Sequence, residues 1–508
     1  MNSNIKRRSF MKLAGAGLAG MLMSGTSSAK TSKNKPNIVL ILADDFGYSS
    51  LNSYGADKKL IRTPYIDRIA EKGMRFTNAC TPASICTPTR YGLLTGRYPW
   101  RTDLKYGVTH IFSELLPDTN RVTIADWLND RGYNTAAIGK WHLGYGHAHD
   151  EIESNIRKRD VDPVEYTKKV SPGPLDLGFD YHFGVPQNHD DALGVFIEND
   201  HIYGIRSSKI HPYSRSFYGQ RYIGFDAPQR VNEDVMEVLT DKSVDWLKQQ
   251  SIDNPFFLYF AAVAVHHPST PSGYMRGMSD CGPYGDFIQD LDLSVGKIIQ
   301  TLKYMNLLEN TIIIFSSDNG GDIPSIERHP HAPENQAIEY GLKINGDLRG
   351  DKHTIYEGGT RVPFIVSWPG NVKKGSVSDD MINLLDVFAT VCEITDGELP
   401  SSKDVAPDSF SFLPSLLNKT NHNPRTSMIT ADVNGMHALH DGNWKYIDNT
   451  PPDGLPEEKL KSLKDFKPQL YNLAEDPGET MNLYEENPAM VKKLEEKLNK
   501  IRMADFTR

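Results

Sequence analysis

Four short apolar runs constrain the fold of this chain more than any other feature of its sequence. They occupy residues 37–42, 135–138, 256–264 and 311–315 and contain many β-branched or aromatic side chains. Continuous runs of this kind are typical of strands that a parallel sheet buries on both faces. Helical patterns lie between them, over residues 235–249 and along an apolar face of Ile288, Leu291, Val295, Ile298, Ile299 and Leu302. Strands that alternate with helices predict an α/β fold with a doubly wound, mostly parallel sheet.

The chain divides into two parts. Its 508 residues, with 39% hydrophobic content, suffice for one large domain and a smaller one. We predict the large domain over residues 35–400, because Ser, Pro and Asp accumulate at residues 400–414 as they do at domain boundaries. Residues 405–508 contain short alternating segments and a terminal helical pattern at 488–502. They predict a C-terminal α+β subdomain with an antiparallel sheet.

The N-terminus has the pattern of a targeting segment. Within residues 1–29, a basic region precedes an apolar stretch at 13–23 and a small-residue cleavage site. The apolar stretch is too short for a stable membrane anchor. The pair Arg7-Arg8 resembles a bacterial twin-arginine signal, with an ordinary secretory signal as the alternative. Either interpretation predicts a periplasmic or secreted bacterial protein.

Charge and cysteine content exclude several classes of function. The formal net charge is −9, and removal of the four basic residues of positions 1–29 lowers it to −13. Such a chain repels nucleic acid and anionic membranes, so an anionic substrate would require locally concentrated positive charge. The four cysteines, Cys80, Cys86, Cys281 and Cys392, have neither the spacing of a disulfide framework nor that of a zinc site.

Polar side chains follow each of the four predicted strands. These residues are Asp44, Asp45, Lys140, His142, His266, His267, Asp318 and Asn319. The carboxyl ends of parallel strands meet at one edge of a sheet, where ligands of open α/β folds bind. Three carboxylates and one amide are hard oxygen donors, which suit Ca²⁺ or Mg²⁺ better than zinc. The sequence therefore predicts a cation site beside lysine and histidine side chains.

Cys86 begins the run Cys-Thr-Pro-Thr-Arg-Tyr-Gly-Leu-Leu-Thr-Gly-Arg, over residues 86–97. Pro88 fits the first turn of a helix, so residue 86 is expected just before free backbone N–H groups that favour an anion. A plain Cys86 thiolate would predict a Cys-His protease or thioesterase. Those enzymes need no site of three carboxylates. The predicted carboxylates therefore argue against a plain thiolate at Cys86.

This run, which includes Arg90, and the segment of residues 345–363 resemble motifs of the formylglycine-dependent sulfatases. These are the sulfatases of arylsulfatase type, in the alkaline-phosphatase superfamily. The resemblance covers nearly all of residues 36–485. It implies an alkaline-phosphatase-like catalytic domain and hydrolysis of sulfate esters. It also implies oxidation of Cys86 to formylglycine (3-oxoalanine) by a maturation enzyme, and a bound ion that is usually Ca²⁺, with Mg²⁺ possible.

The resemblance also implies a role for each site residue. The metal ligands would be Asp44, Asp45, Asp318 and Asn319. Arg90 and Lys140 would hold the formylglycine hydrate, and Lys352 would bind the sulfate and the leaving oxygen. The hydrate would attack sulfur with help from Asp318, and His266 or Lys352 would protonate the leaving alcohol. His142 would then act as the base that releases sulfate.

Export and an acidic surface point to a sulfated carbohydrate substrate and to polysaccharide degradation. Asn188 stands where the family often has serine, and both side chains can donate to a sulfate oxygen. Further candidates for substrate contacts, each equally compatible with an ordinary polar surface residue, are His189, Asp190, Arg349, His353, His437 and His440. The alternatives are a phosphonate monoester or phosphodiester hydrolase of the same superfamily and a catalytically silent glycan-binding protein.

Overall fold

The computed structural model describes residues 35–110, 113–146, 169–191, 194–205, 210–217, 220–225, 227–398, 400, 405–419 and 424–508. The predicted signal segment, residues 1–29, lies outside this part of the chain. Among the described residues, no helix combines the length and the apolar character needed to cross a membrane.

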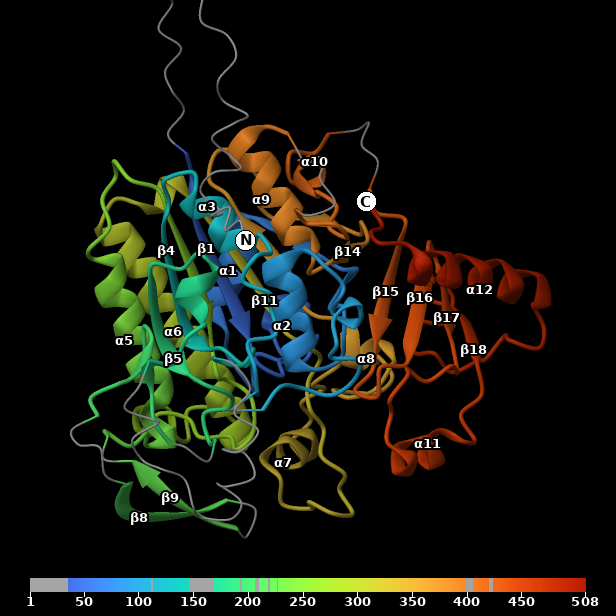
Figure 1. Cartoon of the computed structure of the whole chain (residues 1–508), viewed down its shortest axis with the longest axis horizontal. Coiled ribbons are helices and arrows are strands. Elements are labelled where there is room, and N and C mark those ends of the chain that lie inside the picture. The colour runs from blue at the N-terminus through green and yellow to red at the C-terminus, as the bar shows by residue number, and fades with distance from the viewer. Residues whose placement is uncertain are drawn as a thin grey trace, which may run out of the picture.

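A ten-stranded mixed sheet forms the centre of the molecule (Figure 1), in the order β13-β2-β12-β11-β1-β10-β4-β5-β6-β7. Its strands are β1 (Asn37–Ala43), β2 (Met74–Phe76), β4 (Asn134–Lys140), β5 (Tyr181–Val185), β6 (Ile197–Glu198), β7 (His201–Ile202), β10 (Phe256–Ala261), β11 (Thr311–Ser317), β12 (Phe364–Ser367) and β13 (Ser376–Ser378). The five central strands β11, β1, β10, β4 and β5 are mutually parallel. Each of the four apolar runs is a strand of this parallel centre, as predicted.

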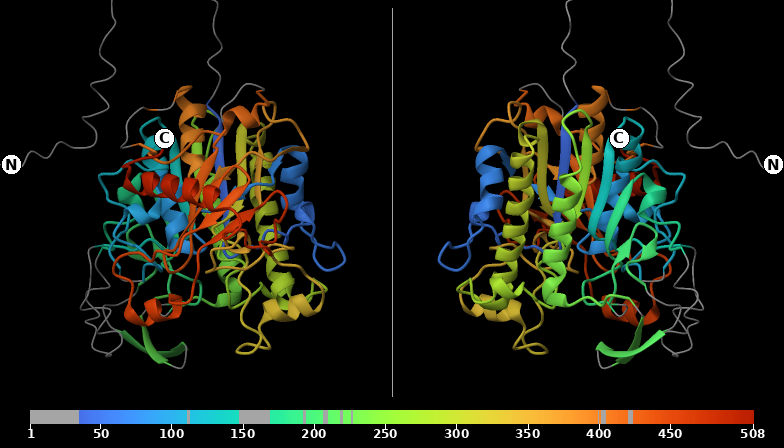
Figure 2. Two further views of the ribbon diagram at one scale, coloured as in Figure 1. Left: turned by 90° about the vertical axis from the view of Figure 1, so that its right-hand side faces the viewer. Right: turned by 90° about the vertical axis from the view of Figure 1, so that its left-hand side faces the viewer.

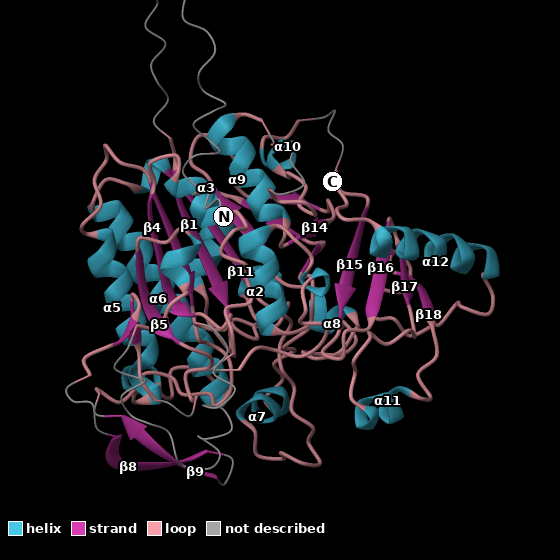
Figure 3. Cartoon of the chain, in the orientation of Figure 1, coloured by secondary structure: helices cyan, strands magenta, loops and turns pink. Residues whose placement is uncertain are grey.

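Helices cover both faces of the sheet because successive side chains of the central strands point in opposite directions. In β1, Val39 and Ile41 pack with residues of α1, α5 and α6, whereas Ile38 and Leu40 pack with residues of α2, α3 and α9. Figure 2 shows α5 and α6 side by side on one face, and Figure 3 shows the layers as helix and strand. The helices are α1 (Pro64–Lys72), α2 (Cys86–Thr95), α3 (Ile124–Asn129), α5 (Val235–Leu247), α6 (Gly282–Tyr304), α7 (Pro333–Glu339), α8 (Glu357–Thr360), α9 (Asp386–Asp396), α10 (Leu413–Leu416), α11 (Glu457–Leu463) and α12 (Pro488–Met503). The predicted doubly wound α/β class is confirmed.

A second sheet of four antiparallel strands lies beside the main body (Figure 1). Its strands are β15 (Ser427–Ala431), β16 (His437–Asp441), β17 (Trp444–Ile447) and β18 (Gln469–Asn472). Helix α12 packs on it through Val491, Leu494 and Leu498. Phe412 and Leu416 still belong to the core of the first sheet, so the residues before β15 complete the main body.

Two smaller sheets complete the structure. Strand β3 (Ala79–Cys80) pairs with β14 (Ile382–Asn383), and β8 (Ile210–Phe217) pairs with β9 (Gln220–Phe225) as a hairpin. Strand β3 directly precedes the loop that leads to Cys86 and α2. The main sheet and this loop together position the site described next.

Candidate active site

The polar residues that follow β1, β4, β10 and β11 meet at the carboxyl edge of the parallel sheet. The site rests on a close approach of two loops: Gly320, after β11, donates its N–H to Gly359 O at 2.9 Å. A Cβ atom at Gly320 would lie 1.8 Å from the Gly358 carbonyl oxygen, so only glycine permits this approach. The loop of Asp318 is thereby fixed against the loop that presents Lys352.

Three buried carboxylates form the centre of the site. One ligand atom from each of Asp44, Asp45, Asp318 and Cys86 lies within 4.8 Å of the others. Asn319 donates from Nδ2 to Asp45 Oδ1 at 2.8 Å, and its Oδ1 has no hydrogen-bond partner among the described residues. Four oxygen-bearing side chains with one unused carbonyl oxygen fit a hard cation such as Ca²⁺ or Mg²⁺.

Two fully buried cations balance these carboxylates. Arg90 donates from Nε and Nη2 to Asp318 Oδ2 at 2.9 and 2.7 Å, and Lys140 Nζ donates to both oxygens of Asp44 at 2.9 and 2.7 Å. Arg90 also binds the Lys140 carbonyl oxygen at 2.9 Å, which links the two. Burial alone would raise the pKa of Asp318, but the charges of Arg90 and Lys140 lower it. The carboxylate therefore stays ionised.

Residue 86 occupies the first turn of α2 and points into this cluster. Its Sγ lies 3.3 Å from Lys140 Nζ and 3.7 Å from Asp44 Oδ1. Burial raises the pKa of the Cys86 thiol far above its usual range, even though Lys140 opposes the rise. A thiol that stays protonated at neutral pH is a weak nucleophile, so this environment does not suit the thiolate interpretation.

His142 has the geometry of a neutral base. Its Nε2 lies 3.1 Å from the Thr109 carbonyl oxygen, which accepts only, so the proton resides on Nε2. Nδ1 is buried without a partner among the described residues. Burial first, and then Lys140 and Arg90, lower the pKa of His142 well below its ordinary value. The ring is therefore neutral, with a free acceptor nitrogen.

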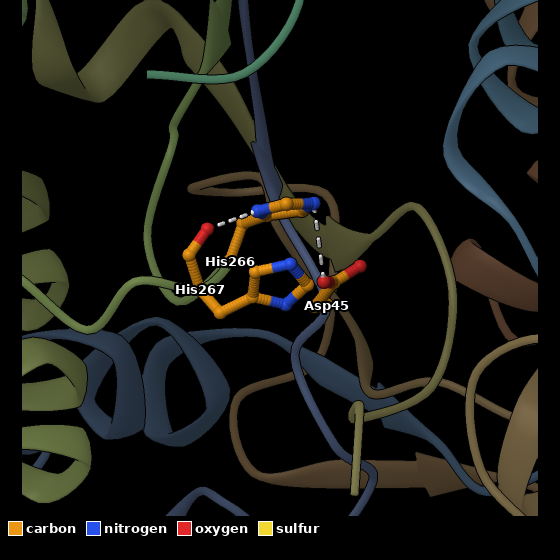
Figure 4. Close-up of side chains that lie close together, drawn as sticks. All are labelled: Asp45, His266 and His267. Atoms are coloured by element: carbon orange, nitrogen blue, oxygen red, sulfur yellow. Dashed lines mark hydrogen bonds and ion pairs between the residues drawn. The ribbon is translucent and has the colours of Figure 1, made fainter. Parts of the chain in front are cut away.

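His266 and His267 lie side by side near Asp45 (Figure 4). His266 Nδ1 donates to the His267 carbonyl oxygen at 2.6 Å, and its Nε2 lies 3.7 Å from Asp45 Oδ2. His267 instead binds Asp322 through Nδ1 at 3.2 Å. Lys352 completes the group, with Nζ 2.7 Å from Asp45 Oδ2 and 3.7 Å from Asp322 Oδ2.

The pKa values of Lys352 and His266 are shifted in opposite directions. The carboxylates of Asp45 and Asp322 raise the pKa of Lys352 well above its usual value, although burial alone would lower it. Burial and the charge of Lys352 lower the pKa of His266 well below its usual value. At neutral pH the lysine therefore holds a proton on the nitrogen that faces the site, whereas His266 is a neutral ring.

The expected substrate contacts lie in three different environments. His189 is fully buried, with Nε2 3.0 Å from the Pro268 carbonyl oxygen, and its ring packs 6.4 Å from that of His266. Asn188 and Asp190 flank it and are half-buried. Arg349 binds Tyr471 Oη at 3.0 Å and the Glu479 carbonyl oxygen at 2.8 Å, so it joins its loop to the C-terminal sheet.

The three further histidine candidates differ in exposure. His353 is exposed beside Lys352. His437 is buried and binds Arg502 Nε at 3.0 Å through Nδ1. His440 is buried, and its Nε2 lies 3.8 Å from Glu357 Oε1. Of these three, only His353 presents its ring to a ligand outside the protein.

Two residues of the site were not predicted from the sequence. Thr109 binds His142 with both its carbonyl and its hydroxyl oxygen, but it lies in an irregular segment without a motif. Asp322 holds Lys352 and His267, and it stands only four residues beyond Asp318. Its acidic side chain in a glycine-rich strand-end loop was a signal that could have identified it.

The comparisons with known proteins agree with this geometry. The family model described as sulfatase matches residues 36–397. The chain therefore belongs to the sulfatase family, and it is a sulfuric ester hydrolase.

Individual relatives extend over almost the whole chain. An N-acetylgalactosamine-6-O-sulfatase of Bacteroides thetaiotaomicron is 35% identical, over 92% of this chain and 93% of its own length. Human arylsulfatase A is 32% identical, over 88% of this chain and 83% of its own length. A solved structure from B. thetaiotaomicron, described under the metabolism of multiple glycosaminoglycans, superimposes with a TM-score of 0.80 at 34% identity and covers 93% of this chain and 100% of that one.

Proposed function

We propose that this protein hydrolyses sulfate esters of a sulfated carbohydrate at the buried cluster around residue 86. The observation that carries the proposal is the convergence of Asp44, Lys140 and Asp318 on the Sγ atom of Cys86 at the first turn of α2. A helix N-terminus and two buried cations favour an anion at this point, as a sulfate ester requires.

Residue 86 would be active after oxidation to formylglycine, which supplies a hydrated aldehyde as the nucleophile. A divalent cation, with Ca²⁺ as the first candidate, would be held by Asp44, Asp45, Asp318 and Asn319 and would polarise a sulfate oxygen. The unused Oδ1 of Asn319 and the short separations among the carboxylates support this donor set. Conversion of the cysteine requires a maturation enzyme as a partner.

The surrounding side chains would orient residue 86 and transfer protons. Lys140 and Arg90 stay charged and hold residue 86 and its carboxylate neighbours in one geometry. His142, neutral with a free Nδ1, would accept a proton when sulfate is released. Asp318, kept ionised by Arg90, would accept a proton from the nucleophile.

The leaving alcohol needs a proton, and Lys352 supplies it in this proposal. Its ammonium group faces the site, whereas His266 is neutral and donates its Nδ1 proton to a backbone carbonyl. His266 would instead position the leaving oxygen. A Lys352→Met variant should therefore lose much more turnover on a sugar sulfate than on an aryl sulfate, whose phenolate leaves without protonation. Equal losses on both substrates would assign Lys352 to binding alone.

The similar proteins suggest the first substrate to test. Several relatives that match 88% or more of this chain are named N-acetylgalactosamine-6-sulfatases or N-acetylgalactosamine-6-O-sulfatases. We therefore propose 6-O-sulfated N-acetylgalactosamine units as the first candidate, with Asn188, His189, Asp190, Arg349 and His353 as the candidate contacts. The N-terminal pattern supports export to the periplasm or the medium. Residues 35–400 would form most of the catalytic domain, whose core Phe412 and Leu416 complete, and the rest of residues 405–508 would form its C-terminal subdomain.

The test combines analysis of the reaction products with a variant that is expected to be inactive, Cys86→Ala. The protein, co-expressed with a maturation enzyme, is assayed for sulfate and phosphate release from sulfated glycans, aryl sulfates and phosphonate esters. We expect sulfate from a glycan and none from Cys86→Ala, which should keep the fold. Activity of that variant at the level of the parent would refute the proposal, and phosphate release above sulfate release would favour the phosphonate alternative.

A further inference from the structure

Two basic hollows flank helix α1, and we call them together the basic groove. Helix α1 lies on the flank of the molecule in both views of Figure 2. We propose that this groove binds a second stretch of a sulfated polysaccharide while another stretch occupies the active site. The inference rests on the proposed function, because it takes the substrate to be a polymer that carries several sulfate groups.

The first part of the groove lies between α1 and the edge strand β13. It is a hollow of about 690 Å³ that four basic side chains line, Lys58, Arg62, Arg68 and Arg75. Three of them are exposed, and Arg75 is half-buried. Two acidic residues, Asp67 and Glu71, line the same hollow. Asp67 is already engaged, because its oxygens accept from the Ser53 N–H at 2.8 Å and the Thr63 hydroxyl at 3.1 Å.

The second part of the groove lies on the other side of α1. It is a hollow of about 450 Å³ that shares Arg68 with the first and adds Lys72, Lys303 and Lys374. One acidic residue, Glu309, lines it. The two hollows together present seven cations against three acids, on a chain whose net charge is −9. Positive charge is therefore concentrated in this groove, although the chain as a whole is negatively charged.

These seven cations are available to a ligand. Within the part of the chain that the structure describes, none of them forms an ion pair, although ion pairs occupy many other lysines and arginines. The Arg75 guanidinium lies over the aromatic ring of Tyr54, 5.2 Å from its centre. Arginine presents a planar fork of donors that matches sulfate oxygens, so three arginines and four lysines suit a chain of sulfate groups.

The groove is separate from the active site. Its second hollow touches Ile313 near the start of β11, whereas Asp318 follows the end of that strand. Five residues of extended chain separate the two by about 16 Å. The edge strand β13 lies four places from β1 in the sheet order. A monosaccharide sulfate cannot reach both places at once, but a polymer can.

The same surface could in principle attract another anionic macromolecule. The overall negative charge opposes association with an extended anionic membrane, because the repulsive surface around the groove would be brought close to it. A single flexible sulfated chain can lie in the groove and avoid the rest of the surface. The observations therefore favour the polysaccharide, and a lipid surface becomes one outcome of the test.

The experiment measures binding without turnover. In a Cys86→Ala background, the triple variant Arg62→Gln/Arg68→Gln/Lys72→Gln is compared with Lys492→Gln/Lys493→Gln/Lys500→Gln, which makes the same charge change on α12. The probe is a polysaccharide of 6-O-sulfated N-acetylgalactosamine units, titrated at several salt concentrations. We expect the groove variant to lose about tenfold in affinity and to show a weaker salt dependence, and the α12 variant to match the parent.

Two further measurements separate the possible failures. In the Cys86-containing enzyme, the groove variant should keep its kcat/KM on a monosaccharide sulfate and lose it on the polymer. Equal polymer binding by both triple variants would overturn the inference while leaving the sulfatase assignment intact. Loss of binding to phosphatidylglycerol vesicles without any change in polymer binding would also overturn it and assign the groove to lipid. Absence of sulfate release from every substrate would refute the proposed function but leave the binding result interpretable.

Discussion

Among the described residues, two of the buried charge clusters have opposite characters. One surrounds residue 86 at the strand ends of the main sheet. The other joins the main body to the C-terminal sheet, where Lys445 Nζ lies 3.0 Å from Glu357 Oε1 and 2.8 Å from Glu479 Oε1. Glu357 also pairs with Arg361 at 2.5 Å. We call this second group the interface network.

The difference lies in what each cluster leaves unused. In the active site, Asn319 Oδ1 and His142 Nδ1 are buried without partners among the described residues. Left-handed backbone does not separate the two clusters, because Asp45, His142 and Glu479 all have it, with φ of 58°, 55° and 53°. In the interface network, by contrast, Glu357 accepts from both Arg361 and Lys445. Glu479 Oε1 makes no hydrogen bond among the described residues, but it lies 2.8 Å from the Lys445 ammonium group, so its charge is balanced.

This contrast separates structural from functional charge. Buried ions that neutralise one another fix how two parts of the chain pack, and removal of one partner is strongly destabilising. Buried polar atoms with neither a hydrogen bond nor an opposite charge beside them are typical of sites that wait for a ligand. The predictions below test this contrast.

The largest expected effects come from the same substitution made in each cluster. Lys140→Met should reduce sulfate release by about 10³-fold, because it removes a preorganised cation from residue 86. Lys445→Met should lower the free energy of unfolding by about 3–5 kcal/mol, because it leaves the buried carboxylate of Glu479 without its cation and Glu357 with Arg361 alone. Steady-state kinetics and urea unfolding, both in the presence of calcium, measure the two effects.

The same two variants, Lys140→Met and Lys445→Met, can also disprove the distinction between functional and structural charge. The folded fraction of Lys445→Met should keep most of its turnover per molecule, whereas the folded fraction of Lys140→Met should not. If Lys445→Met instead abolished turnover per folded molecule, the interface network would belong to the catalytic machinery. The distinction between the two clusters would then collapse.

Removal of divalent cations should affect only one of the clusters. A cation bound at 100 times its dissociation constant stabilises the native state by about 2.7 kcal/mol, so chelation should lower stability by that order. Thermal unfolding with and without a chelator measures this loss, and added calcium should reverse it. Asp318→Asn should make stability insensitive to the chelator, whereas Glu479→Gln should leave the calcium effect unchanged. A parent protein that is indifferent to chelation would contradict the assigned donor set.

The smallest expected effect is on the pH dependence of stability, through His440 beside the interface network. Burial lowers the pKa of His440 to about 3, so the ring is neutral in the folded protein and takes up a proton on unfolding. Above the pKa of about 6.5 that the histidine has in the unfolded chain, this residue does not lower the free energy of unfolding. As the pH falls below that value, the free energy of unfolding decreases, by about 2 kcal/mol between pH 6.5 and 4.5. The free energy of unfolding of His440→Gln should therefore depend less steeply on pH over this interval. An unchanged slope would show that the proton uptake occurs elsewhere.

Much of the fold could be predicted from the sequence because its central strands are buried on both faces. The run at residues 37–42 has no polar side chain beyond Asn37, and it forms β1 at the centre of the sheet. Edge elements such as β13 carry a polar sequence, Ser-Val-Ser, and contain no comparable signal. Their pairing is decided by contacts with distant segments, which a single sequence does not show.

The site was predictable to the extent that its residues follow strands. Asp44, Lys140, His266 and Asp318 could be grouped because parallel strands end at one edge. Thr109 could not be predicted, because it reaches His142 through an irregular segment 33 positions earlier in the chain. The interface network was also beyond prediction, since Glu357 and Lys445 are 88 positions apart and meet only when the second sheet packs.

The central claim is that residue 86 acts as an oxidised cysteine within the buried cluster. We would express the protein with graded amounts of a maturation enzyme and measure two quantities in each preparation. These are the fraction of residue 86 converted to aldehyde, by peptide mass, and the rate of sulfate release per molecule. The account predicts that the rate rises in proportion to the converted fraction and extrapolates to zero for the thiol. Full turnover in a preparation that retains the Cys86 thiol would contradict it.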